Sequence, residues 1–555
     1  MRRTRIESGV YPRLSALSLT MLLAACSVGP DFHPPKADVP AQWQDTQRAA
    51  SAAAASAAVP AAVPASGTNT ANATGHANPS PATSVPTLDT DPDPRWWRNF
   101  NDPLLDSLIE RAARGNLDLQ EAVLRIVEAR TQVQSAAAQG LPNVRATGSY
   151  TREQLGVKGF LESDGVYDKV NQLGAPNSPV NAIAPGAGAN NLLNQLTSPV
   201  NLWQAGFDAS WELDLFGRVR RSVESAQAQT EVAEESRNDA LLSLEAEVAQ
   251  TYMQLRGAQS LRAITASLVD QQREIVTLTQ SQAKVGLASD IDVKSAVAQL
   301  AQTQAQLPQY DQQIAQALNG LAYLVGEAPG ALETELATPA AVPPVPPTVP
   351  VGLPSTLARR RPDIRRAEAS LHAATASVGV AVAQFYPDVS LTGQIGTRAQ
   401  NASDLSRWSH LFYSFGPSVS LPIFQGGALV SNLRMSKAQQ AEAALDYRKT
   451  VLTALRDVDN ALAVYRTDQA RRDALGDSVA AQQTSYELAR DSYRKGITSF
   501  INVLDAERQL AQARQQYAQG TMQVSTDLVA LYKALGGGWQ DATDAGAAPV
   551  SRDGG

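Results

Sequence analysis

The sequence predicts an α+β membrane protein whose chain repeats one unit of β-strands and long helices. Segments that alternate apolar and polar side chains over about ten residues indicate strands long enough to cross a membrane when tilted. Two much longer stretches lack proline and carry apolar residues in a 3,4 rhythm, which indicates coiled-coil helices. Both patterns recur about 210 residues further along the chain, so a duplicated unit organises the fold.

The N-terminus has the form of a lipoprotein signal peptide at residues 1–25. Basic residues precede an apolar run, and Leu23-Ala24-Ala25-Cys26 fits a bacterial lipobox. We expect the Cys26 thiol to carry the lipid, and Ser27 after it resembles the pattern of lipoproteins sent to the cell outer membrane. The alternative is an ordinary signal peptide with an incidental cysteine. The expected location is therefore the outer membrane, with a covalent lipid as the only attached group.

Composition excludes several other classes of protein. The one cysteine leaves no disulfide framework and no CxxC metal site, and the four histidines include no pair at i, i+4. Lys and Arg total 47 against 54 Asp and Glu, which disfavours a nucleic-acid partner. No GxSxG or P-loop motif is present. We therefore expect no enzyme activity, no metal and no cofactor.

Shifts in composition divide the chain. The segment from Gln47 to about Thr90 is so rich in Ala, Ser, Thr and Pro that it cannot bury enough apolar surface to offset ordering. The expected parts are a lipidated segment and low-complexity tether at 26–90, a first strand-helix repeat at 91–338, a Pro-rich linker at 339–358, a second repeat at 359–538, and a flexible tail at 539–555.

The first clear strand spans residues 203–213. Its apolar face carries alternate residues from Trp203 to Leu213, and its polar face is expected to line a pore through Gln204, Asp208, Ser210, Glu212 and Asp214. Residues 413–423 repeat the pattern, and shorter strands are expected at 144–150 and 389–395. A soluble antiparallel sheet is the alternative, but aromatic residues at both ends of an apolar face favour a membrane barrel.

Four strands are too few to close a barrel, for which about eight are needed. Open sheet edges would leave backbone groups unsatisfied in lipid. Three copies that give twelve strands are the simplest cyclic solution, so we expect a homotrimer in contact with outer-membrane lipid.

Long helices are expected from Arg218 to about Lys284 and from Ala428 to about Lys495. Return helices are expected to begin near Ser289 and Ser499 and to end at Gly326 and Gly536. Glycines 286 and 496 then lie at the tips of two helical hairpins. Ser289-Asp290-Ile291-Asp292 has the form of a capping box at the start of the first return helix.

With these elements in place, the chain resembles a known family. The motifs that carry the resemblance are CSVGPDFHPP, WWRNFNDPLLDSLIERAARGNLDLQEAVLRIVEAR, WELDLFGR, RRPDIRRAEASL, LPIFQGG and the two tip sequences. Together they resemble the outer-membrane efflux lipoproteins of the TolC-like superfamily, in its NodT/OprM-like branch. The resemblance implies a trimer in which a twelve-stranded barrel continues into a long periplasmic α-helical barrel. It also implies an exit duct for small molecules in a tripartite pump, with a periplasmic adaptor and an inner-membrane transporter of the RND type as partners.

The resemblance also implies a gate at the periplasmic hairpin tips. Carried over by motif position, the gate consists of Ile501, Asp505, Asp292 and Tyr493. Carboxylates from three copies would repel one another near one axis and bind cations. Acids in the first turns of a helix are, however, more often caps. Asn502 and Thr498 stand where some relatives have an acid and an arginine, so the salt-bridge lock of those relatives is not carried over to these two positions.

The same resemblance places the adaptor on the tips, at Val285, Gly286, Leu287, Gly496 and Ile497. A simpler role for the two glycines is a turn that needs positive φ, and both roles are compatible. The alternative function is the exit duct of a type I protein-secretion system, which the lipobox and the N-terminal motifs disfavour. The exported compound is not specified by the sequence.

Overall fold

The computed structural model describes residues 27–36, 39–48, 51, 84–87, 92–154, 156–173, 198–286 and 288–540. Cys26, the signal peptide and Leu287 lie outside these residues, as do the tail from 541 and most of the tether. The chain divides into two compact units. We call Met1–Asp31, Gln132–Ala226 and Thr375–Ala438 the strand unit, and Phe32–Thr131, Gln227–Ala374 and Gln439–Gly555 the helical unit.

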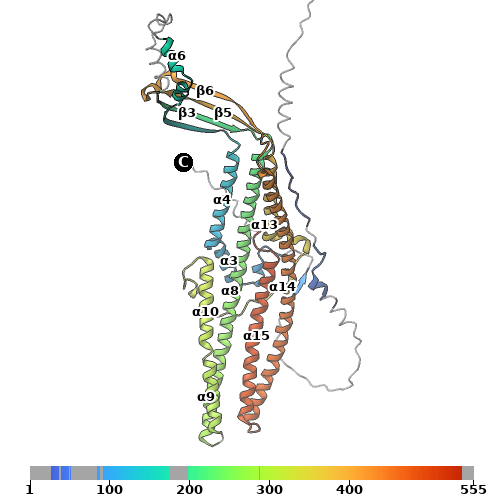
Figure 1. Ribbon diagram of the computed structural model, residues 1–555. Helices are drawn as coiled ribbons and strands as arrows, with labels where there is room; N and C mark the ends of the chain where they lie inside the picture. The colour runs from blue at the N-terminus through green and yellow to red at the C-terminus, as the bar shows by residue number, and fades with distance from the viewer. Residues whose placement is uncertain are drawn as a thin grey trace, which may run out of the picture. The chain divides into compact units, whose positions relative to one another are not determined.

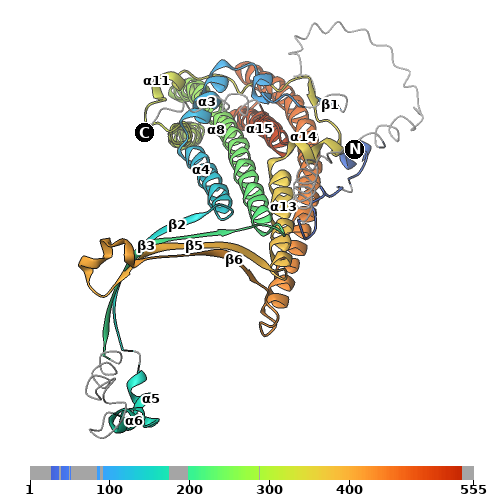
Figure 2. The same cartoon turned by 90° about the horizontal axis from the view of Figure 1, so that it is seen from above.

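The strand unit contains one antiparallel sheet of four strands in the order β2-β3-β5-β6 (Figure 2). The strands are β2 (Asn143–Glu153), β3 (Val200–Glu212), β5 (Asp388–Ala399) and β6 (Leu411–Ser420). Short helices α5 (Val157–Ser163) and α6 (Val166–Leu173) follow β2, and turns η3 (Ala402–Ser406) and η4 (Trp408–His410) follow β5. All four expected strands are present, each somewhat longer than or shifted from its expected range.

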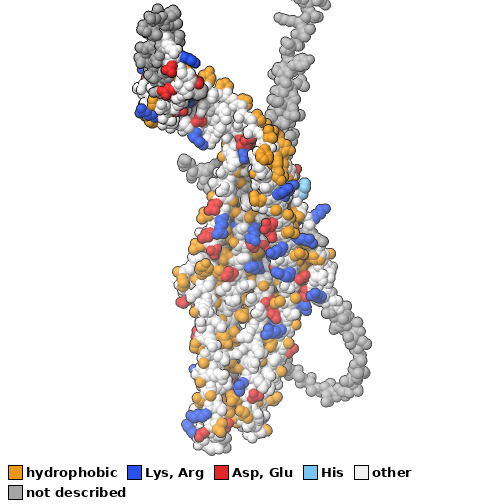
Figure 3. Space-filling model, viewed as in Figure 1, with side chains coloured by type: hydrophobic (Ala, Val, Ile, Leu, Met, Phe, Trp, Pro, Cys, Tyr) orange, Lys and Arg blue, Asp and Glu red, His pale blue; other side chains and the backbone are white. Residues whose placement is uncertain are grey.

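The alternation expected from the sequence is in register across the sheet. Phe207 pairs with Ala146 and with Ile395, so apolar residues align on one face. Asp208 pairs with Arg145 and with Gln394 on the other. Apolar side chains lie exposed along this sheet and at the strand-to-helix junction, as Figure 3 shows. One face of the sheet therefore presents apolar side chains outward from the unit.

Two helices of 67 residues each follow β3 and β6. They are α8 (Arg218–Lys284) and α14 (Ala428–Arg494), whose starts and ends both lie 210 positions apart. In the helical unit they run beside α9 (Asp290–Gln304), α10 (Leu307–Val325) and α15 (Phe500–Ala534), as in Figure 1. The helix boundaries expected from the absence of proline are confirmed to within one residue.

The first return helix differs from the expectation of one continuous helix. It is broken between α9 and α10, at Ala305 and Gln306, whereas α15 is continuous. Pro308 lies in the first turn of α10 and has no backbone N–H to donate to the preceding turn. Ala518 occupies the position 210 residues later, so the second return helix continues without a break.

Shorter elements complete the units. These are η1 (Trp96–Phe100), α3 (Pro103–Gly115), α4 (Leu117–Ala138), α11 (Glu333–Leu336), η2 (Pro354–Thr356), α12 (Leu357–Arg360) and α13 (Pro362–Ala383). The main core of the helical unit includes Trp96 stacked on Tyr532, with ring centroids 5.3 Å apart. Among the described residues, no helix has both the length and the apolar character needed to cross a membrane.

The end of the expected tether and the Pro-rich linker form a small sheet. Strand β1 (Val85–Thr87) pairs in parallel with β4 (Thr348–Pro350). Ser84, just before β1, donates its N–H to Gln469 at 2.7 Å and is buried. Composition indicated no structure at 84–87, because a backbone pairing with a distant segment leaves no local pattern in the sequence.

Candidate channel gate and lining

Glycine forms the turn at each hairpin tip of the helical unit. Gly286 has φ +77° and Gly496 has φ +67°, a region that side-chain-bearing residues rarely adopt. At the second tip, Gly496 donates its N–H to the Tyr493 carbonyl at 2.9 Å, and Ile497 donates to that of Ser492 at 2.9 Å. These two bonds close the end of α14 in a Schellman-like turn. The left-handed turns expected at both glycines are present.

The two hairpins pack against each other next to the tips. Phe500 and Leu504 from α15 are buried with Ala296 from α9, and Ile275 and Val276 from α8 pack against them. This apolar contact joins the two helical hairpins of the chain, so the tip of one hairpin is positioned by the other.

Tyr493 lies at the centre of this contact. Its hydroxyl donates to the Gln282 side-chain oxygen on α8, and its ring lies 5.6 Å from that of Phe500. Burial, followed by the charge of Asp292, raises the pKa of the Tyr493 hydroxyl above its usual value. The expected linking position of Tyr493 therefore coincides with a hydrogen bond between the two hairpins.

The expected gate acids lie in different surroundings. Asp292 closes the capping box, because it accepts the Ser289 N–H at 3.0 Å and Ser289 accepts the Asp292 N–H at 3.2 Å. Asp505 is exposed on α15 and accepts a hydrogen bond of 2.8 Å from Gln509. Asn502 donates to Thr498 at 2.5 Å, one turn away on the same hairpin. Asp505 is thus the more accessible of the two acids.

The tips also carry exposed apolar side chains. Val285 is 69% exposed, Ile497 is 75% exposed and the gate candidate Ile501 is 60% exposed. Exposed apolar side chains of this kind are candidates for a contact with another protein. Leu287, the remaining expected docking residue, lies outside the described residues.

The sequence analysis did not identify a buried acid near the expected gate. Glu507, two residues after Asp505, is 1% exposed, and neither carboxyl oxygen has a hydrogen-bond partner among the described residues. Burial raises the pKa of Glu507 to about 7, and the nearby Gln272 amide acts in the opposite direction. The spacing in the sequence is the one signal that points to it, because Glu507 lies midway between the apolar residues Leu504 and Leu510, which are both buried.

The polar face of the sheet is held by side-chain contacts within the strand unit. Asp208 accepts a hydrogen bond of 3.0 Å from Thr147, and Gln204 accepts one of 3.0 Å from Arg398. A cavity of about 520 Å³ lies along this face and is lined by Asp208 and Ser210 among others. Three of the five expected lining residues are therefore central on the polar face.

The two remaining lining candidates lie at the end of β3. Glu212 is its last residue and forms an ion pair with Arg218. Asp214 lies beyond the strand and accepts the N–H groups of Val219 and Arg220 at 3.1 and 2.9 Å. The expectation that Asp214 belongs to the strand face is wrong, because the strand ends before it and its carboxylate caps α8.

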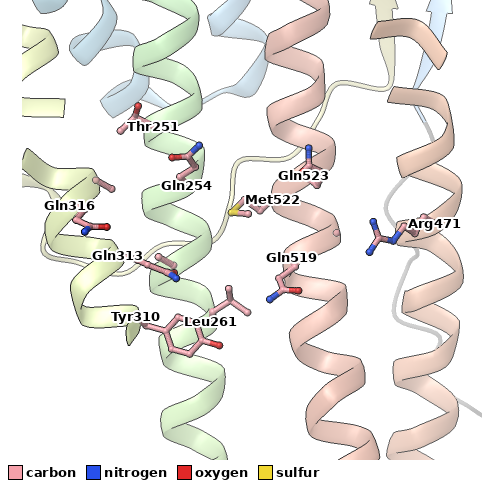
Figure 4. Close-up of a pocket in the computed structure, with 13 residues that line it drawn as sticks. Thr251, Gln254, Leu261, Tyr310, Gln313, Gln316, Arg471, Gln519, Met522 and Gln523 are labelled. Carbon is pink, nitrogen blue, oxygen red and sulfur yellow. The ribbon is translucent and has the colours of Figure 1, made fainter. Parts of the chain in front are cut away.

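A second cavity, of about 680 Å³, lies between α8, α10 and α15 in the helical unit (Figure 4). Its polar lining is mainly uncharged side-chain amides: Gln254, Gln313, Gln316, Gln519 and Gln523. Arg471 on α14 is the charged residue among those that line it. A surface of this kind offers hydrogen bonds to polar solutes with little charge selection.

A long helical hairpin that follows each strand pair, with a sheet whose apolar face is exposed, is the architecture of an outer-membrane channel. The chain belongs to the outer membrane efflux protein family, whose sequence profile matches residues 108–327 and 353–537. The resemblance drawn from the sequence motifs is thereby confirmed. The protein is an efflux channel of the outer membrane.

Individual relatives match nearly the whole chain. The probable efflux pump outer membrane protein TtgC of Pseudomonas putida is 32% identical over 534 residues, which cover 96% of each chain. Nodulation protein T of Rhizobium leguminosarum bv. trifolii is 27% identical, with 97% of this chain and 99% of the relative covered. The first of these names describes a pump component, in line with the expectation of a channel.

Solved structures show the same fold. The outer-membrane channel OprN is 32% identical, with a TM-score of 0.74 over 93% of this chain and 100% of that chain. The Campylobacter jejuni CmeC outer membrane channel has a TM-score of 0.71 at 21% identity, over 92% of this chain and 95% of that chain. The second likeness concerns the fold alone.

Proposed function

We propose that three copies of this chain assemble into the exit duct of a tripartite efflux pump. The observation that carries the proposal is the sheet of the strand unit. Its outer strands β2 and β6 each pair on one side only among the described strands, and one face is apolar and exposed. Closure of three such sheets into a twelve-stranded barrel would satisfy both edges and place the apolar face against lipid.

The polar strand face then lines the pore. Gln204, Asp208, Ser210 and Glu212 would face water inside the barrel, where acidic groups favour cations over anions. Cys26 would carry a lipid that adds a second attachment to the membrane. The equal length and the 210-residue spacing of α8 and α14 support duplication of one strand-helix unit, with the repeats at 91–338 and 359–538 joined by the linker at 339–358. Residues 26–90 form the leading part of that division. The tail follows Trp539 and does not include it as expected, because Trp539 is buried in the helical unit and donates its ring N–H to the Arg360 carbonyl at 2.8 Å.

The hairpin tips are the proposed gate and docking surface. Asp505 and Ile501 on α15 would approach the axis, with Asp292 and Tyr493 linking the neighbouring hairpin. A periplasmic adaptor would dock on the tips at Val285, Gly286, Leu287, Gly496 and Ile497, where the described side chains include exposed apolar ones. An inner-membrane transporter of the RND type would supply the energy, and the duct itself would conduct passively.

The cargo class follows from the relatives. Relatives of this chain are named for efflux of antibiotics, of solvents and of toluene. The amide-lined cavity offers hydrogen bonds to polar small molecules with little selection by charge. We infer a cargo of small organic molecules of broad chemistry.

Deletion of the gene in its own host tests this function. We expect the deletion strain to accumulate a fluorescent small-molecule pump substrate and to become more sensitive to antibiotics or solvents, with restoration by the wild-type gene. The control is a gene with Gly496 and the residues of its tip deleted, which should not restore efflux. A normal efflux phenotype together with loss of one secreted protein from the medium would contradict the proposal and support a protein-secretion duct.

A further inference from the structure

We propose that β6 of one copy pairs with β2 of the next in one defined register, in which Ser418 lies opposite Thr147 of the partner subunit. The inference rests on the proposed trimer and goes beyond it, because a closed barrel is compatible with many strand registers. Contacts inside the strand unit serve as the template for contacts between copies.

The template is the pairing of β3 with β5, where the two halves of the chain meet. Strands β3 and β6 end at Glu212 and Ser420, 208 positions apart, and both lead into a long helix. Strands β2 and β5 begin at Asn143 and Asp388, 245 positions apart, each one residue after a proline. Strand β6 is therefore the counterpart of β3, and β2 is the counterpart of β5.

Transfer of the template fixes the register between copies. Within one copy, Ser210 pairs with Thr392 and Phe207 pairs with Ile395. The counterparts of the first pair are Ser418 and Thr147 of the partner subunit. The counterparts of the second pair are Phe415 and Tyr150 of the partner subunit.

The two faces of the sheet agree with this register. Phe415 is 81% exposed and Tyr150 is 52% exposed, and the register puts these two apolar rings together on the lipid-facing side. Ser418 and Thr147 come together on the polar side. A slip by one residue would place Phe415 against the polar face of β2, so odd-numbered slips are excluded.

The strand-to-helix junction allows the same offsets to be checked on a contact outside the strands. Phe216, just after β3, stacks on Tyr386, just before β5, with ring centroids 4.9 Å apart. Their counterparts at the same offsets are Phe424, which is 88% exposed, and Leu141, which is 63% exposed. The transferred register brings Phe424 onto Leu141 of the partner subunit, so that both exposed apolar side chains gain a partner.

One competing register differs by two residues. In the β2–β3 hairpin, Asn143 pairs with Ser210. In the β5–β6 hairpin, the counterpart of Asn143 is Asp388, which pairs with Ser420, two residues beyond Ser418, the counterpart of Ser210. If the offset between these two β-hairpins were used in place of the strand ends, Ser418 would lie opposite Ser149 of the partner subunit. We favour Thr147 because the strand ends give the offset of 208 and the same offset matches Phe216 with another phenylalanine, Phe424, whereas the register within each β-hairpin also depends on loops of different length.

Disulfide cross-linking of full-length trimers tests the register. Cβ atoms directly opposite in adjacent strands lie about 4.5–5.5 Å apart, against about 7–8 Å for diagonal neighbours, so an oxidant discriminates a shift of two residues. The test pair is Ser418→Cys with Thr147→Cys, and its matched control is Ser418→Cys with Ser149→Cys. Directly opposed residues of an antiparallel pair alternate between hydrogen-bonded positions, which are farther apart, and non-hydrogen-bonded positions, which are closer. A second test therefore uses the neighbouring position, Val419→Cys with Ala146→Cys. Its control is Val419→Cys with Gly148→Cys.

The readout is the band pattern on non-reducing gels, with native mass spectrometry confirming a trimer for each variant. We expect rapid conversion to covalent dimer and trimer in at least one test pair, at a rate at least tenfold above its control. Faster linkage in the controls, or no linkage in any pair of a trimeric protein, would overturn the register while the proposed duct stands. A monomeric protein without conductance would overturn both.

Discussion

Replacement of Glu507 by glutamine tests how a buried acid responds to pH beside the proposed gate. Glu507 lies on α15 between the two hairpins, near Gln272 of α8 and Tyr486 of α14. Within the described part of the chain, no ion pair offsets the burial of its carboxyl group. The ionised form is therefore unfavourable in the folded protein, and the neutral amide introduced by Glu507→Gln would remove that cost with little change of shape.

The expected magnitude follows from the pKa. In the unfolded chain Glu507 titrates near a pKa of 4.5, whereas burial raises the folded-state pKa to about 7. Its contribution to the free energy of unfolding is therefore full below pH 4.5 and is lost as the pH rises through about 7. Between about pH 6 and about pH 8 the loss is on the order of 1 kcal/mol, which is up to roughly tenfold in the opening equilibrium.

Hydrogen exchange measured by mass spectrometry on the purified trimer provides the assay. We expect the tip peptides that include Val503 and Leu510 to lose about tenfold in protection between about pH 6 and about pH 8, after correction for intrinsic exchange rates. Glu507→Gln should abolish this pH dependence. Glu487→Gln, the same change at an exposed position on α14, should leave it intact. Equal pH dependence in wild type and Glu507→Gln would refute the reasoning.

Three further predictions concern the gate, the anchor and the hairpin contact. Asp505→Ala should raise single-channel conductance and weaken block by Mg²⁺, whereas unchanged block would show that these carboxylates do not meet near the axis. Cys26→Ala should abolish palmitate labelling and leave the trimer intact, and loss of all outer-membrane protein would contradict the barrel as the main membrane contact. Tyr493→Phe removes the hydrogen bond to Gln282 and keeps the ring packing, so tip exchange should speed up by a factor that corresponds to about 1 kcal/mol, and unchanged exchange would argue against the bond.

The sequence predicted elements whose causes are local. Alternation over β3 and β6 reports a sheet with two different faces, because successive side chains point to opposite sides. The ends of α8 and α14 follow from the absence of proline inside them and the glycines just beyond, at 286 and 496. Pro308 is also a local signal, and it indicates the break between α9 and α10. The prediction of one continuous return helix was wrong because it rested on the repeat and not on this proline.

Features that depend on distant residues were not predictable in the same way. The pairing of β1 with β4 joins backbone groups far apart in the chain, which leaves no composition signal. Glu507 is buried because α8 and α14 cover one face of α15, and the sequence of α15 alone does not say which of its acidic residues lie on that face. Asp214 was predicted to lie on the strand face because the alternation of apolar and polar residues continues past Glu212, where β3 ends. Its carboxylate instead caps the start of α8.

Single-channel recording in planar lipid bilayers tests the central claim most directly. We expect the purified full-length protein to insert as trimers and to produce discrete conductance steps of one size, with cation preference from the acidic lining. Conductance should rise in Asp505→Ala, because the smaller side chain widens the proposed constriction at the tip. Insertion of intact trimers without any conductance, in the wild type and in Asp505→Ala alike, would contradict the account of this protein as an outer-membrane duct.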